Sequence, residues 1–184
     1  MNLIPESILI EQAKTDREVF GKLYDRHYDQ ILNYIVRRTA DIQVSQDITS
    51  EVFLKALRGI HKYRWNGIPF LAWLYRIASN EIATYYRDKK RQKDTELALI
   101  KWNDTQTSSA EMELIHAEEE VRRNQEYLFL QQQLSMLPMK YQEVITLRYF
   151  EKKQLNEIGQ ILGKKEGTIK SLLHRGLEKL RKNL

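Results

Sequence analysis

The stretch LNEIGQILGKKEGTIKSLLHRGLEKLRK, residues 155–182, decides the fold of the C-terminal part of the chain. Apolar residues recur in it at helical spacing, in two runs: Leu155, Ile158, Ile161 and Leu162, then Ile169, Leu173, Leu177 and Leu180. Gly163 lies between the runs and breaks the chain. The pattern predicts a helix, a turn at glycine and a second helix from Glu166 to about Lys182, which is the helix-turn-helix arrangement.

The outward side of that last helix carries residues suited to DNA. Arg and Lys can donate to guanine edges, Ser and His can contact bases or phosphates, and the start of a helix favours a phosphate oxygen. A solvated face of a three-helix bundle is the alternative, but the preceding glycine-broken pair favours DNA. The predicted contacts are Thr168, Lys170, Ser171, His174 and Arg175.

An earlier helix of the same module starts at Leu137-Pro138, and its apolar stripe comprises Tyr141, Val144, Ile145 and Tyr149. The N-terminal half also has helical periodicity. Thr15 and Glu18 form a predicted capping box for a helix that continues through Ile35. A second helix is predicted from about Asp41 to Leu57, and Gly59 then lets the chain turn.

A third helix is predicted from Phe70 through Tyr86, with Pro69 in its first turn. One face of it carries Arg76, Asn80, Thr84 and Arg87, and a basic run follows that comprises Arg87, Lys89, Lys90, Arg91 and Lys93. The preceding loop, Tyr63-Arg64-Trp65-Asn66, adds aromatics on which unpaired bases could stack. The alternative places the aromatics in the core, and for Trp73 the core is favoured.

The periodicity fails from Gln92 to about Glu113. We therefore expect an all-α protein of two small helical domains, residues 1–91 and 125–184, joined by a flexible linker over residues 92–124, with the helix-turn-helix in the second.

Composition narrows the functional classes. The formal net charge of +5 and pI near 9.3 favour a polyanionic partner, and the absence of cysteine excludes disulfides and thiolate metal sites. Neither an export signal nor a membrane span is evident, so we expect a cytoplasmic protein without membrane insertion. The four histidines are scattered and join no carboxylates at metal-ligand spacing, so we expect neither an enzyme nor a cofactor.

Two stretches in the first half and several in the second resemble the extracytoplasmic-function (ECF) group of bacterial sigma factors. The first two are DITSEVFLKAL, residues 47–57, and FLAWLYRIASN, residues 70–80. The second half adds Leu137-Pro138, LRYF at 147–150, EIG at 157–159, EGTIKS at 166–171 and LHRG at 173–176. The resemblance covers most of the chain.

The resemblance implies that the chain binds core RNA polymerase and directs promoter-specific initiation, including melting. The helix from Asp41 would dock on the clamp coiled coil of the largest subunit, with Asp47, Glu51, Phe53 and Lys55 as candidate contacts. The first domain would read the minus-ten element and capture a flipped base, and the second would read the minus-thirty-five element. The candidate minus-ten contacts are Tyr63, Arg64, Trp65, Asn66, Arg76, Asn80, Thr84 and Arg87.

Family members are commonly held inactive by an anti-sigma partner until a stress signal arrives, and the resemblance implies such a partner here. Leu71, Thr84 and Leu172 depart from the residues frequent at these places, so the promoter sequence does not follow from the resemblance. The alternative is a DNA-binding regulator that acts without polymerase and uses its first domain for dimerisation or sensing. The aromatics beside a basic helix and the acidic face around Asp47 argue against it.

Overall fold

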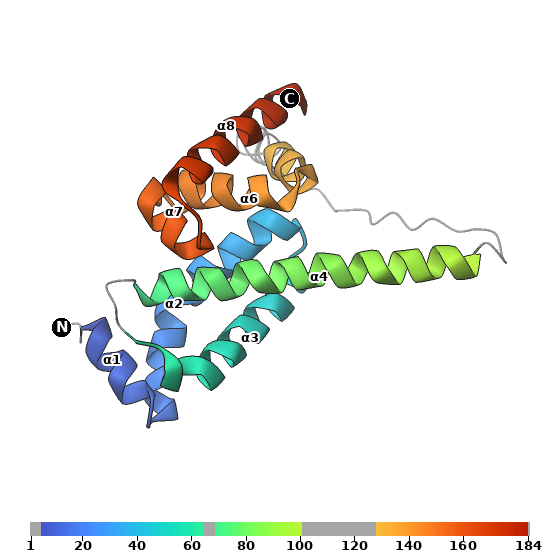
Figure 1. The fold of residues 1–184 in the computed structure, drawn as a ribbon. Coiled ribbons are helices and arrows are strands. Elements are labelled where there is room, and N and C mark those ends of the chain that lie inside the picture. Colours follow the sequence, from blue (N-terminus) through green and yellow to red (C-terminus); the bar gives the residue numbers. More distant parts are fainter. Residues whose placement is uncertain (1–4, 65–68, 101–127, 184) are drawn as a thin grey trace, which may run out of the picture.

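The computed structural model describes residues 5–64, 69–100 and 128–183, with backbone only for 93–100 and 183. The first module contains α1 (Glu6–Ala13), α2 (Arg17–Thr39), α3 (Ile42–Gly59), the 3-10 turn η1 (Ile60–Lys62) and α4 (Phe70–Ile100). The second contains a helical stretch at 128–136, α6 (Met139–Ile145), the π-helical turn η2 (Thr146–Phe150), α7 (Leu155–Leu162) and α8 (Glu166–Asn183). Every regular element of these ranges is helical (Figure 1), which confirms the predicted all-α class.

The residue that caps the start of the helix is the one expected from the sequence for α3, but a different one for α2. Asp41 caps α3, because its carboxylate accepts from the backbone N–H of Val44 at 3.0 Å. The predicted capping box at Thr15 is wrong: Asp16 caps α2 and accepts from the N–H of Glu18 at 2.8 Å. The Thr15 hydroxyl donates instead to the carbonyl of Gln12, since the chain there leaves the preceding helix.

That preceding helix, α1, had no sequence prediction. It buries Leu9, Ile10 and Ala13, which lie at helical spacing, and it packs against α2. At its start, Glu6 Oε1 lies 2.8 Å from His27 Nε2 of α2. The pattern is short, which explains why it was missed.

Two features at the ends of α3 and α4 correct the sequence analysis. Helix α3 ends at Gly59 and the chain continues into the 3-10 turn η1, but Gly59 lies in right-handed backbone at φ −95°, which any residue can adopt. It provides space instead, because a Cβ there would lie 3.3 Å from the Trp73 ring. Helix α4 continues past Gln92 to Ile100, and Figure 1 shows it projecting beyond both modules.

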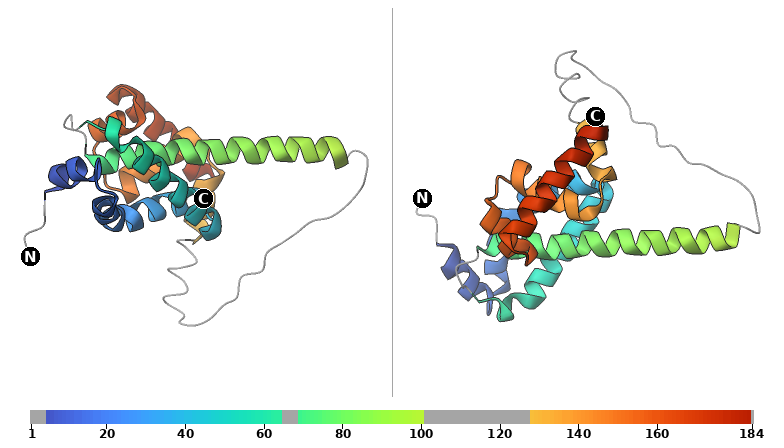
Figure 2. Two further views of the ribbon diagram at one scale, coloured as in Figure 1. Left: turned by 90° about the horizontal axis from the view of Figure 1, so that it is seen from below. Right: turned by 45° about the horizontal axis from the view of Figure 1, so that its top comes forward.

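The second module has the predicted helix-turn-helix. Gly163 ends α7 in left-handed backbone at φ +64°, which glycine adopts without strain. Ile158 and Ile161 of α7 and Ile169 and Leu173 of α8 are buried as predicted, whereas Leu177 and Tyr149 are exposed. Helix α7 lies against α4 and η2 lies against α2, so the two modules pack together (Figures 1 and 2).

Candidate nucleic-acid interface

The five residues predicted on the outward side of α8 are all exposed. Ile169 and Leu173 are buried against the module core, and their spacing fixes which side of α8 faces outward. Lys170 Nζ lies 2.9 Å from Glu166 and His174 Nε2 lies 3.6 Å from Glu178, within α8. Such exposed pairs contribute little to stability, so DNA phosphates can displace them at small cost.

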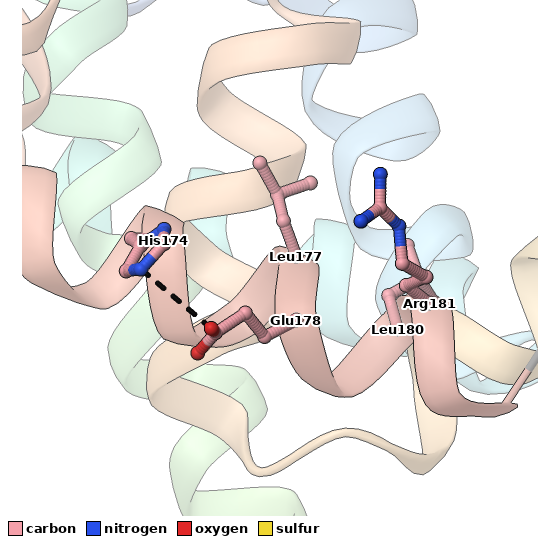
Figure 3. A pocket seen from close by; sticks show the side chains of 5 residues that line it. All are labelled: His174, Leu177, Glu178, Leu180 and Arg181. Atoms are coloured by element: carbon pink, nitrogen blue, oxygen red, sulfur yellow. Dashed lines mark ion pairs between the residues drawn. The ribbon is translucent and has the colours of Figure 1, made fainter.

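Figure 3 shows the His174–Glu178 pair on α8 and Leu177, which directly precedes Glu178. Leu177 is exposed because it borders an open apolar groove rather than the closed core. Exposed Tyr149 borders the same groove, which explains why helical periodicity placed both residues inward. The groove is lined by Leu130, Leu134, Ile145, Tyr149, Phe150, Leu177 and Leu180.

A second cationic face lies on α4 in the first module. Arg76, Asn80 and Arg87 are exposed there, while Thr84 is half-buried and accepts from Arg87 Nη2 at 3.3 Å. Leu74, Ala78 and Ile82 are buried on the opposite side, which sets the rotation of the helix. Lys89, Lys90 and Arg91 continue the exposed positive charge toward the projecting end of α4.

The loop before α4 differs from the expectation of exposed aromatics. Tyr63 is only 7% exposed, and its ring centroid lies 5.5 Å from that of Phe70 and 5.0 Å from that of Trp73. Burial raises the pKa of its hydroxyl to about 12. The ring therefore belongs to the core and offers no free face for a base. Arg64 is exposed, and Trp65 and Asn66 lie outside the described residues.

The predicted polymerase-docking face borders a groove between α3 and α4. Its acidic residues are Asp47 and Glu51 of α3 and Glu81 and Asp88 of α4. The sequence does not connect the two pairs, because they lie on helices that only the tertiary fold brings together. Four carboxylates in one groove suit a basic partner surface.

Two other predicted docking residues of α3 behave differently. Lys55 Nζ lies 2.6 Å from Glu81 and 3.5 Å from Glu51, and its hydrogen bond with Glu81 raises the pKa of the ammonium group. Phe53 is only 3% exposed and packs 4.7 Å from the ring of Tyr24, so its assignment as a contact is wrong. It faces the core because it lies beside Val52 and Ala56 on the buried stripe.

The comparisons with known proteins agree with this division of the chain. Residues 23–92 match the model for Sigma-70 region 2, and residues 134–182 match Sigma-70, region 4. ECF RNA polymerase sigma factor SigW of Bacillus subtilis is 32% identical over all of this chain and 98% of its own length. The chain belongs to the ECF sigma factor family.

Two further relatives extend the comparison. ECF RNA polymerase sigma factor BldN of Streptomyces coelicolor is 31% identical over 94% of the chain, which spans 63% of the length of BldN. The sigma factor RpoE from Bartonella quintana, solved in complex with the anti-sigma factor NepR, has the same fold. It aligns with a TM-score of 0.65 at 18% identity, over 89% of this chain and 94% of its own.

The two matched regions correspond to the two cationic faces. Region 2 includes α3 and α4 up to Gln92, with the acidic groove and the Arg76 face, and region 4 includes α6, α7 and α8. As a sigma factor, the chain directs transcription initiation by RNA polymerase. None of the helices in the described ranges combines the length and apolar character that crossing a bilayer requires.

Proposed function

We propose that this sigma factor divides promoter recognition between its two modules, residues 1–91 and 125–184. Helix α4 reads the minus-ten element through Arg76, Asn80, Thr84 and Arg87. Helix α8 reads the minus-thirty-five element through Thr168, Lys170, Ser171, His174 and Arg175. The observation that carries the proposal is that each module turns one polar, cation-bearing helix face outward, opposite its own core.

Promoter melting needs a site that compensates for unpairing. Extruding a base costs a few kcal/mol, and stacking on an aromatic ring returns roughly 1–3 kcal/mol per base. We assign the flipped base to the loop before α4, with Trp65 and Asn66 as its contacts. Arg64 and Arg76, both exposed, would hold the adjoining backbone. Tyr63, which precedes these residues, packs against Phe70 and Trp73 in the core.

Docking on polymerase is assigned to the acidic groove between α3 and α4. Asp47 and Glu51 would face basic residues of the clamp coiled coil in the largest subunit, and Glu81 and Asp88 extend the same field. Lys55 orders the groove by bridging Glu51 and Glu81. The sigma factor itself would catalyse no covalent step and need no cofactor, because the polymerase makes the RNA.

An anti-sigma partner and a cytoplasmic site of action complete the proposal. The related RpoE was solved in complex with an anti-sigma factor, and both modules here expose the charged surfaces that such a protein would cover. The stress signal that releases the sigma factor would act on that partner.

Core binding and promoter use are tested separately. Purified protein with core polymerase should start run-off transcription at a cognate promoter, selected from a library of promoter fragments. Arg175→Ala should weaken use of the upstream element and leave capture by core polymerase unchanged. Asp47→Arg should abolish capture by core polymerase, whereas Asp29→Arg, an exposed change of equal charge on α2, should not.

The outcomes separate the two candidate functions. Duplex DNA binding without any capture by core polymerase would refute the assignment and favour a regulator that acts alone. Loss of core binding in the Arg175→Ala protein would contradict the assignment of α8.

A further inference from the structure

One carboxylate of the second module is held by two helices of the first. Glu151 follows η2, and its side chain is 8% exposed. It accepts from Arg37 Nη1 of α2 at 2.8 Å and from the hydroxyl of Tyr75 of α4 at 2.5 Å. Burial and the hydrogen bond to Glu151 raise the pKa of Tyr75, so its hydroxyl stays protonated and donates.

Further contacts surround this carboxylate. The guanidinium of Arg37 lies over the ring of Phe150, 5.1 Å from its centroid, and Lys153 Nζ lies 5.8 Å from the centroid of Tyr75. Gln131 Nε2 donates to the carbonyl of Val36 at 2.8 Å. Two separate parts of the second module, residues 150–153 and Gln131, thus contact the C-terminal end of α2 or the start of α4.

A second ion pair lies beside the first. The side chain of Arg38 is 0% exposed and donates from Nη1 to the hydroxyl of Tyr34 at 2.7 Å. Its Nη2 lies 3.5 Å from Glu143 Oε1, which belongs to α6 of the other module. A buried guanidinium is costly unless a carboxylate is near it, so the burial of Arg38 depends on the second module staying in place.

The packed arrangement conflicts with simultaneous recognition of both promoter elements. Helix α7 packs on α4, and α8 packs on α7. Two helix–helix spacings of about 8–10 Å place α8 roughly 20 Å from α4. The elements are named for positions 25 base pairs apart, which is about 85 Å of duplex at roughly 34 Å per ten base pairs. The modules must therefore separate before both helices can reach their sites.

We propose that the free sigma factor inhibits itself by closing its two modules on one another, with Glu151 as the latch between Arg37 and Tyr75. The inhibitory consequence rests on the proposed function, because it requires α4 and α8 to read separate elements. Polymerase and promoter would open the latch by competing for the two modules. The residues that line the acidic groove between α3 and α4 do not include Arg37, Tyr75 or Glu151, so core polymerase can engage the groove while the latch is closed.

Distance measurement on the free protein tests closure. Because the chain has no cysteine, Gln30→Cys with Lys179→Cys gives two unique spin-label sites, one exposed position in each module. The labelled protein should give a single narrow distance distribution. Arg37→Glu should broaden and lengthen it, since two carboxylates then face each other, and adding Glu151→Arg should restore the narrow distribution. Lys22→Glu, exposed on α2 with the same charge change, should leave it unchanged.

Closure is refuted if the distance distribution of the labelled parent protein is as broad as that of the Arg37→Glu variant. It is also refuted if Arg37→Glu leaves the distance between the labels unchanged. Far-ultraviolet circular dichroism checks that each variant keeps its helices. Should Arg37→Glu unfold, Tyr75→Phe keeps the ring and removes only the hydroxyl. Its distribution should then shift toward longer distances, and an unshifted distribution would refute the latch.

Transcription separates this inference from the proposed function. Core polymerase and promoter should lengthen the label distance in the parent protein. The Arg37→Glu protein should reach half-maximal run-off transcription at a concentration about tenfold lower, which corresponds to about 1.4 kcal/mol of closure. If the free protein shows the long label distance of an open form and still transcribes with core polymerase, closure is refuted and the proposed function stands. If the free protein shows the short label distance of the closed form but never transcribes with core polymerase, the proposed function is refuted and closure stands.

Discussion

Replacing Gly159 with alanine should destabilise the helix-turn-helix, because the turn approaches this residue closely. A Cβ at Gly159 would lie 2.7 Å from the backbone oxygen of Lys164, nearer than side-chain carbons approach in folded proteins. That oxygen cannot move freely, because the N–H of Lys164 donates to the carbonyl of Gly159 at 2.8 Å and holds the turn.

The magnitude follows from two opposing effects. Overpacking costs about 1–3 kcal/mol, and a backbone obstacle places this site at the upper end. Alanine in place of glycine within a helix returns about 1 kcal/mol. The Gly159→Ala protein should therefore lose about 2 kcal/mol of unfolding free energy. Promoter use through α8 should weaken as well, since this turn sets the angle between α7 and α8.

Urea unfolding followed by circular dichroism measures the effect. Gly167→Ala is the matched control in the same module, because a Cβ at Gly167 would meet nothing within 4 Å. This control should be neutral or more stable, by at most about 1 kcal/mol. Equal effects of the two substitutions, or a Gly159→Ala protein as stable as the parent, would refute the close approach at the turn.

Three other predictions concern single side chains. Asp41→Ala removes the cap of α3 and should lower the unfolding free energy by about 1 kcal/mol in urea titration, whereas an unchanged midpoint would contradict the cap. The hydrogen bond from His27 lowers the pKa of Glu6 from its ordinary value of 4.5, so its stabilisation is present above that pH and lost as the pH falls through the lowered value. Glu6→Gln should accordingly flatten the loss of stability below about pH 5, and a curve parallel to that of the parent protein would exclude the pair. Lys170→Ala should reduce the slope of log affinity against log salt by about 1 on duplex promoter DNA, if Lys170 contacts a phosphate; an unchanged slope would remove that contact.

Much of the fold could be predicted from local sequence alone. Helix α3 begins after Asp41 as expected, because an N-cap depends only on residues within one turn. The rotation of α8 was likewise predicted by Ile169 and Leu173, whose spacing decides which side is buried. The end of α4 was not predicted, since the sequence pattern extended this helix only through Tyr86 and the basic run after it, whereas the helix continues to Ile100.

Whether a single side chain is buried or exposed often depended on residues from other parts of the chain that pack beside it. Tyr63 was expected at the surface and Leu177 in the core, yet the first is buried and the second exposed. Each assignment depends on what lies opposite the side chain: Trp73 and Phe70 cover Tyr63, whereas an open groove lies beside Leu177. The acidic groove likewise joins Glu51 with Glu81, which no periodicity connects.

The sequence by itself determined most of the longer helices, the glycine-broken pair and the two outward faces, because these follow from spacing along a few turns of one helix. Only the tertiary structure decided that Glu151 meets Arg37 and Tyr75, residues 114 and 76 positions away. Contacts across such separations depend on how apolar faces pack, and a carboxylate becomes a latch only when that packing removes it from water.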